Sequence, residues 1–319
     1  MRIVRYIVIG IATLIVAQPV SAHAGEPPAP HDLWQSWPWE PWIVVGLALG
    51  ALLYLYGLRR LWRRAGWGRV VSTRQVLCFS SGLLVIAIAL LSPLAAVSNA
   101  LFSAHMIQHI LLMNVAAPLL IWGLEPTLVL WALPVATRRG VGRWWRRRAL
   151  LQTGWRWLNQ PLVVWAIYAL TLWIWHAPRF YQAAIASEAV HLLEHMGFIA
   201  SALLFWWVLN QAGHQTLQLG AALLFLFTTA LHSGLLAAII TFAQRPLYPI
   251  YAPYVWAWGL TLLSDQQLAG VIMWVPVGFV YLAALLWRLW QQLAKADAET
   301  SFQERPESSQ VNLQKFLES

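Results

Sequence analysis

The sequence contains a single cysteine, Cys78, among 319 residues. One cysteine cannot form an intrachain disulfide, and no C-x-x-C motif is present to build a cysteine-based metal site. Charged residues are also scarce, at 10% of the chain, whereas a soluble domain has about 25%. Any soft-metal site in this chain must therefore use histidine and methionine.

Apolar residues dominate instead. They make up 60% of the chain, the mean hydropathy is +0.59, and 22 residues are tryptophan. Because a helix needs about 20 apolar residues to cross a bilayer core, the sequence predicts an all-α fold, a polytopic membrane helix bundle with about seven transmembrane helices. The predicted spans are residues 42–58, 75–97, 105–123, 161–177, 190–210, 219–243 and 267–290.

The two ends of the chain differ from this transmembrane domain, residues 42–291. Residues 1–24 combine a basic start, an apolar run and a small-residue cleavage pattern, which predicts a signal peptide; an uncleaved first helix is the alternative. Residues 25–41 are a predicted periplasmic segment, and the polar residues 292–319 are a predicted cytoplasmic tail, disordered or weakly helical. The stretch from Glu125 to Pro134 is too short to span and is expected to be interfacial or re-entrant.

Lysine and arginine are unevenly distributed between the connections. Six arginines lie in the connection 59–74 and seven in the connection 138–156, and four basic residues follow from Arg288 onward. On the other side of the predicted membrane, Arg179 and Arg245 stand alone. By the positive-inside rule the basic side is cytoplasmic, so the mature N-terminus is periplasmic and the C-terminus cytoplasmic. These loops account for the net charge of +9, and we expect a lipid bilayer rather than a nucleic acid as the partner.

Five of the nine histidines fall at the periplasmic ends of the predicted spans. His105 and His109 (HMIQH) form one i,i+4 pair, His191 and His195 (HLLEH) form a second, and His176 closes another span in WIWHAP. Positions i and i+4 lie on one helix face, one turn apart, where two imidazoles can bind one metal ion. These five histidines are the predicted metal ligands, and one site with a spare ligand or two sites fit them equally.

Methionines accompany these histidines. Met106 and Met196 each follow a paired histidine directly, Met113 lies four residues after His109, and Met273 lies in the last span. Thioether and imidazole together suit copper, especially Cu(I), although each methionine alone also fits ordinary helix packing. Copper is therefore the predicted ion, with these four methionines as possible auxiliary ligands.

Three further polar residues in the spans are possible auxiliary groups. Glu194 can orient a ligating histidine or carry a proton. Asp265 can bind the metal, orient an imidazole or cap its own helix. His232 lies mid-span beside Ser233, where hydrogen-bonded helix packing is its simplest role.

Three other functions are alternatives to a non-enzymatic protein that holds a bare ion. The HLLEH run matches the H-x-x-E-H pattern of inverted zinc proteases, but the sequence offers no evident third ligand or substrate cleft. A haem-binding electron-transfer protein takes axial histidines from facing helices, a role open to His176 or His232. A membrane copper transporter needs polar steps through the inner half of the bilayer, where only His232 and Met113 are candidates.

Several motifs of the chain are similar to those of a known family: HMIQH with AAPLLIWG, then WHAP, HLLEHM and DQQLAGVIMW. Together they resemble the seven-helix bacterial CtaG family of cytochrome c oxidase assembly factors, over about residues 40–290. The resemblance implies a role in maturing a haem-copper oxidase, with delivery or insertion of copper as the expected step. It also implies an oxidase subunit and a periplasmic copper donor as partners, and the bacterial plasma (inner) membrane as the location.

Overall fold

The computed structural model describes residues 27–211 and 218–303, and its regular structure over these residues is helical, with no strand. Six helices are long and apolar enough to cross a membrane, and a seventh span results if α9 and α10, bent by 69°, count as one. This confirms the predicted all-α membrane bundle, while the predicted signal peptide lies outside the described residues. The helices of 16 or more residues are α2 (Pro41–Ala65), α3 (Thr73–Leu91), α10 (Pro161–His176), α12 (Glu188–Gln211), α13 (Leu219–Phe242) and α14 (Leu262–Gln303).

The most enclosed span is built from α5 (Phe102–Ile110), a π-helical turn η2 (Leu111–Ala116) and α6 (Ala117–Gly123). Buried residues make up 61% of its apolar window, against 22% for α2. Pro118 explains the π-helical turn, because it cannot donate to the carbonyl four residues earlier and its ring crowds that carbonyl. The indole Nε1 of Trp206 donates to the carbonyl of Met113 at 2.9 Å, so the widened turn is stabilised from a neighbouring helix.

The second predicted span, residues 75–97, is shorter in the structure. Ser72 and Gln75 form a capping box at the start of α3, which then ends at Leu91. Ser92 follows in an extended conformation, and its side chain accepts from the Leu94 amide to start the short helix α4 (Pro93–Val97). A proline is tolerated at the first position of a helix but not in its interior, so the apolar run divides at this point.

The basic connection between α6 and α10 is helical, which the sequence did not indicate. It contains α7 (Pro126–Ala132), α8 (Val135–Arg146) and α9 (Ala149–Leu158). The predicted interfacial piece is α7, which turns back against α2 and buries Leu128 completely. Gly57 makes this close approach possible, because a Cβ there would lie 2.5 Å from the Leu128 carbonyl oxygen.

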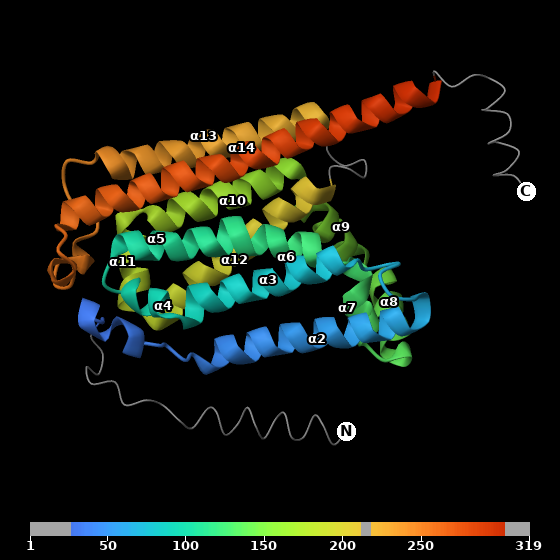
Figure 1. The fold of residues 1–319 in the computed structure, drawn as a ribbon, viewed down its shortest axis with the longest axis horizontal. Helices are drawn as coiled ribbons and strands as arrows, with labels where there is room; N and C mark the ends of the chain where they lie inside the picture. The colour runs from blue at the N-terminus through green and yellow to red at the C-terminus, as the bar shows by residue number, and fades with distance from the viewer. Residues whose placement is uncertain (1–26, 212–217, 304–319) are drawn as a thin grey trace, which may run out of the picture.

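The last two long helices, α13 and α14, pack side by side (Figure 1). They are joined through the short 3-10 helices η4 (Pro249–Tyr251) and η5 (Val255–Trp258). A Cβ on Gly270 would lie 2.7 Å from the backbone nitrogen of Thr241, so the two backbones are in contact there. Helix α14 continues to Gln303, so residues 292–303 are helical. The sequence predicted a disordered or weakly helical tail from residue 292.

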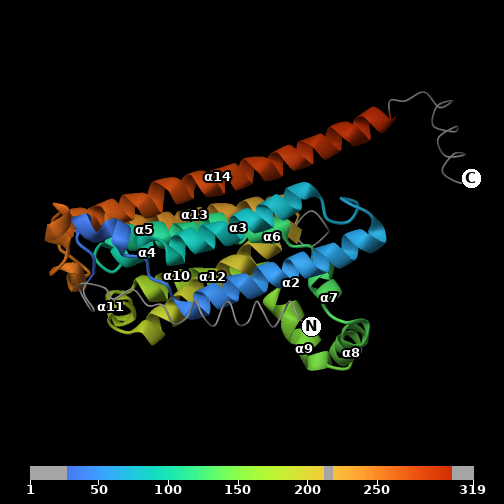
Figure 2. The same cartoon turned by 60° about the horizontal axis from the view of Figure 1, so that its bottom comes forward.

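The two ends of the bundle differ in chemistry. The start of α5, the short α4 and the short α11 (Pro178–Ala186) lie at one end, and the arginine-bearing α8 and α9 lie at the other, together with α7 (Figures 1 and 2). In both views α2 and α14 run along opposite sides of the bundle. The helices that carry the candidate histidines, α5, α10 and α12, lie between them.

Candidate metal centre

Helix α5 presents the first histidine pair to the interior. His105 and His109 are 0% and 4% exposed, and their ring centroids lie 4.2 Å apart, as expected for consecutive turns of one helix. The helix is short and begins at Phe102, so its first turn decides where His105 lies. The side chain of its own N-cap residue, Leu101, makes no capping hydrogen bond to that turn.

Asp265 of the neighbouring helix α14 caps this turn. Its carboxyl oxygens accept from the Phe102 amide at 2.7 Å, from the Ser103 amide at 3.2 Å, and from the Ser103 hydroxyl. Asp265 was a candidate ligand, orienting group or cap of its own helix. The structure makes it a cap of another helix, and its oxygens are already occupied by these donors. It therefore positions α5 and the two histidines that α5 carries.

His176 is the last residue of α10 and is held by its backbone surroundings. Its Nδ1 lies 2.8 Å from the Leu172 carbonyl, an acceptor, so Nδ1 carries the hydrogen and Nε2 keeps its lone pair. The hydroxyl of Tyr248 donates to the backbone carbonyl of His176 at 2.7 Å. These bonds fix the ring with a ligating nitrogen free, the arrangement that metal-binding histidines usually have.

Helix α12 contributes the second pair from its first turns. The His191 and His195 rings lie 4.3 Å apart on one face. They meet the α5 pair, with 5.3 Å between the His105 and His191 centroids and 5.4 Å between those of His109 and His195. His176 completes the group at 6.3 Å from His109. The structure thus brings all five predicted histidines together, and we call them the histidine cluster.

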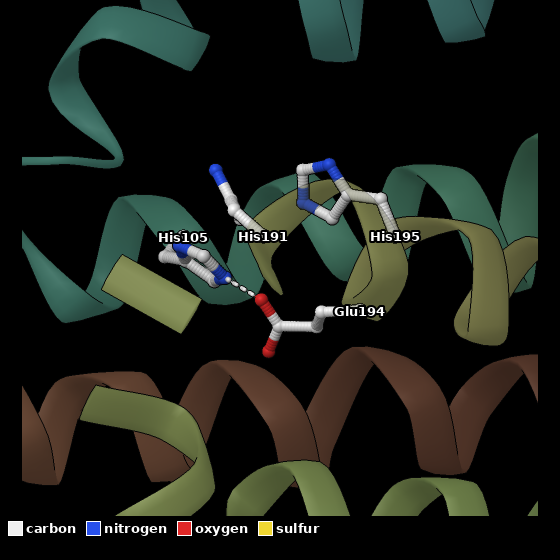
Figure 3. A group of neighbouring side chains, drawn as sticks. All are labelled: His105, His191, Glu194 and His195. Carbon is white, nitrogen blue, oxygen red and sulfur yellow. Dashed lines mark ion pairs between the residues drawn. The ribbon is translucent and has the colours of Figure 1, made fainter. Parts of the chain in front are cut away.

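Glu194 lies beside His105, His191 and His195, below their rings in the view of Figure 3. Its side chain is fully buried, and its Oε2 is 3.7 Å from Nε2 of His105, beyond hydrogen-bond distance. Both carboxylate oxygens lack a hydrogen-bond partner among the described residues. Because a buried carboxylate without compensation is costly, a cation held beside it would be stabilised.

The ligand atoms of this group lie close enough together to hold one metal ion. His105, His191, Glu194 and His195 each offer a ligand atom, and these atoms all lie within 4.8 Å of one another. Around a tetrahedral ion with bonds of about 2 Å, the ligand atoms lie about 3.3 Å apart, so shifts of about 1 Å in each side chain would bring them together. Nitrogens of all five histidines are buried without a hydrogen-bond partner in the described part of the chain. Buried polar groups normally have partners, and a shared cation would provide one for these nitrogens.

A cavity of about 1130 Å³ reaches the cluster at His191 and His195. Its walls come from the segment before α2, the end of α3 and the junction of α11 with α12. Asp32, Glu40 and Glu188 are among the lining residues, which include no lysine or arginine. The cavity therefore gives a cation a path to the cluster past acidic rather than basic side chains.

The auxiliary candidates divide into two groups. Met106, Met113 and Met273 are buried and line a smaller pocket together with His109 and His176. Met196 is 54% exposed, because the position after His195 falls on the opposite face of α12. His232 lies outside the cluster, with its ring 5.5 Å from that of Trp165.

Three tyrosines beside the cluster were not found from the sequence. The hydroxyls of Tyr181 and Tyr251 are 2.6 Å apart, and Tyr251 donates to the Ser98 carbonyl. Burial, and further the nearby charge of Glu194, raises the pKa of Tyr181, Tyr248 and Tyr251, so they remain hydrogen-bond donors. For Tyr248 and Tyr251, the sequence pattern that could have indicated them is the three-residue spacing of tyrosines in YPIYAPY, between the last two spans.

Comparison with known proteins gives one family. The sequence model of the cytochrome c oxidase caa3 assembly factors matches residues 52–295. Two curated relatives, uncharacterized proteins of Mycobacterium bovis and Mycobacterium tuberculosis, are each 24% identical over 273 residues, which cover 81% of this chain and 40% of the relative. The chain thus matches about two fifths of the length of these relatives. No solved structure matches it significantly.

Proposed function

Because the chain belongs to the cytochrome c oxidase caa3 assembly factor family, we propose that it binds copper at the histidine cluster and passes it to a haem-copper oxidase subunit. Copper is the cargo in this account, and the chain acts as a carrier rather than as an enzyme. The observation that supports it best is the convergence of five histidines from α5, α10 and α12, each with a buried ring nitrogen that lacks a hydrogen-bond partner among the described residues.

The donor set favours copper among the metals that imidazole binds. Imidazole alone suits zinc, copper, iron and nickel, whereas thioether sulfur selects for Cu(I). His109 and His176 share a pocket with the sulfur-bearing Met106, Met113 and Met273. Nitrogen ligands alone leave zinc as an equal candidate at the cluster, so the choice of copper rests on the thioethers of the adjoining pocket.

Release to a partner requires labile coordination. The cluster offers five histidines and Glu194, more donors than one tetrahedral ion takes up. These donors come from three different helices, so small movements of one helix exchange one ligand for another. A closed structural site with a fixed set of four ligands would hold its ion too firmly for transfer.

The direction of transfer follows from the charge distribution. The cluster lies at the end of the bundle away from α8 and α9, which carry most of the arginines of the 138–156 connection (Figure 1). With the basic end in the cytoplasm of a bacterial cell, the cluster and its cavity face the periplasm. Copper then arrives from a periplasmic donor and leaves sideways to a membrane partner.

Two other functions predict different chemistry at the same residues. His105 supplies the third donor that the zinc-protease hypothesis lacked, which makes hydrolysis the second candidate. Glu194, however, is not among the residues that line the cavity and is fully buried, so it does not face a substrate held there. A haem does not fit between His109 and His176, because the pocket that they line has a volume of only about 30 Å³.

Metal analysis of the purified full chain tests the proposal. We expect copper in the wild-type protein, clearly less copper in a His105→Ala/His191→Ala variant, and an unchanged amount in the matched control His232→Ala, whose histidine lies outside the cluster. A wild-type protein that takes up no copper, or a double variant that binds as much as the wild type, would contradict the proposal. Protease activity that Glu194→Gln abolishes while the metal stays bound would favour hydrolysis instead.

A deletion strain tests the oxidase partner separately. Loss of the chain should lower the copper content and the activity of the haem-copper oxidase, while leaving other respiratory enzymes unchanged. Normal oxidase in that strain would reject the assembly role even if the purified protein binds copper.

A further inference from the structure

A second pocket lies among sulfur atoms, separate from the large cavity. It is lined in part by His109 and His176 and by three methionines, Met106, Met113 and Met273. We call these five residues the methionine pocket. Its volume is about 30 Å³, and a cavity of about 10–15 Å³ already holds one water molecule. The space therefore suits a single ion or one to two waters rather than an organic ligand.

The three methionines come from different parts of the fold and are all buried. Met106 is on α5, Met113 on the π-helical turn and Met273 on α14, with exposures of 2%, 3% and 6%. The π-helical turn changes the rotational phase of the chain after Ile110, and both Met113 and the following Asn114 line the pocket. Such turns occur frequently at functional sites.

Ordinary packing is the usual role of a buried methionine, but two observations distinguish this group. Flexible methionines normally fill a gap, whereas here three of them surround one. Polar atoms also face the same space without partners: Nε2 of His176, both ring nitrogens of His109, and Oδ1 of Asn114. These three side chains are 4–6% exposed, so bulk water does not satisfy them.

We propose that the methionine pocket is a second metal site, selective for a soft monovalent ion such as Cu(I), with thioether sulfur and the imidazoles of His109 and His176 as its donors. Sulfur ligands prefer soft ions, and hard divalent ions prefer oxygen, so the pocket selects by oxidation state where the histidine cluster does not. The choice of copper rests on the proposed function, but the sulfur donors belong to this site alone. An experiment can therefore reject one of the two proposed sites and still support the other.

His109 and His176 belong to both sites, and a neutral imidazole has one lone pair to give. When both sites are occupied, these two histidines ligate the ion in the methionine pocket, and His105, His191, His195 and Glu194 hold the adjoining ion. The histidine cluster meets the large cavity through His191 and His195, and the methionine pocket lies against Tyr168, Tyr281 and Ser233 within the bundle. An ion in the methionine pocket is thus kept from the cavity by the cluster itself. The arrangement provides storage of reduced copper behind the exchanging site.

Titration of the purified full chain with Cu(I), or with Ag(I) as a redox-silent probe, tests this site. We expect about two ions per chain in the wild type and about one in a Met113→Leu/Met273→Leu variant. Leucine for methionine nearly conserves volume and usually costs less than about 1.5 kcal/mol, so the variant should fold. Met196→Leu is the matched control, because that methionine is 54% exposed, and it should still bind two ions.

X-ray absorption at the copper edge gives an independent readout. Sulfur scattering should be present in the wild type and in His191→Ala/His195→Ala. It should decrease in the methionine double variant. If that variant does not fold, the single variants Met113→Leu and Met273→Leu should each show a decrease. Nitrogen-only coordination of Cu(I) in the wild type, or unchanged stoichiometry and sulfur scattering in the folded methionine variants, would overturn the second site. A wild type that binds one sulfur-ligated ion, unaffected by His191→Ala/His195→Ala, would support the second site and reject the histidine cluster.

Discussion

Replacing Asp265 by asparagine should destabilise the chain and loosen the histidine cluster together. Asp265 is fully buried on α14 and accepts from two backbone amides and one hydroxyl at the start of α5. Asparagine has the same shape but keeps one acceptor oxygen, and its amide group turns a donor toward donors. The first turn of α5 then loses at least one partner, three residues from His105.

The magnitude follows from the three hydrogen bonds. Bonds to charged groups contribute about 1.5–3 kcal/mol in soluble proteins, whereas interhelical bonds within membranes average about 0.6 kcal/mol. Because asparagine keeps one of the two oxygens, one or two of these bonds are lost. Taking about 1 kcal/mol for each gives a loss of about 1–2 kcal/mol, which is a roughly 5- to 30-fold change in the unfolding equilibrium constant.

Reversible unfolding in detergent, followed by tryptophan fluorescence, measures this change. Asp297→Asn is the matched control, because Asp297 is exposed near the end of α14 and should leave the unfolding free energy unchanged. Copper affinity should fall in Asp265→Asn and not in the control. An Asp265→Asn protein within about 0.5 kcal/mol of wild type, with unchanged copper affinity, would refute the claim that this carboxylate positions α5.

Two further substitutions test the packing and the buried charge. Gly270→Ala should separate α13 from α14 and lower the thermal unfolding temperature, because the added Cβ would meet the backbone of Thr241. Gly278→Ala on the same helix has open space around it and should be neutral. Equal effects of the two substitutions would contradict the close contact. Glu194→Gln should weaken copper binding roughly 10- to 100-fold in a competition titration, because it removes the negative charge beside the cluster. Glu125→Gln is the control, since Glu125 precedes α7 at the arginine-bearing end of the bundle, and it should change the affinity little. An unaltered affinity in Glu194→Gln would show that this carboxylate does not interact with the ion.

The sequence predicted the parts of this molecule that depend on short-range pattern. The i,i+4 spacing of His105 and His109, and of His191 and His195, places each pair on one face wherever a helix forms. The span ends then brought His176 to the same level. Apolar length predicted the membrane helices, with boundaries within a few residues for α10, α12 and α13.

The remaining features depend on contacts between distant segments. Asp265 caps a helix that begins 163 residues earlier, so no local pattern indicates its partner. The exposure of Met196 and the burial of Met113 depend on the rotation of α12 and on the π-helical turn before Pro118. The folding of α7 back onto α2 depends on Gly57, whose small size matters only once Leu128 lies against it.

The most direct test of the central claim is the copper content of the oxidase in cells that carry cluster variants. The deletion strain should be complemented with the wild type, with His105→Ala/His191→Ala, or with His232→Ala, each confirmed to be present in the membrane at equal level. The account predicts full copper occupancy and activity of the oxidase with the wild type and His232→Ala, and a copper-deficient oxidase with the double variant. A fully loaded oxidase in cells that carry only the double variant would contradict it.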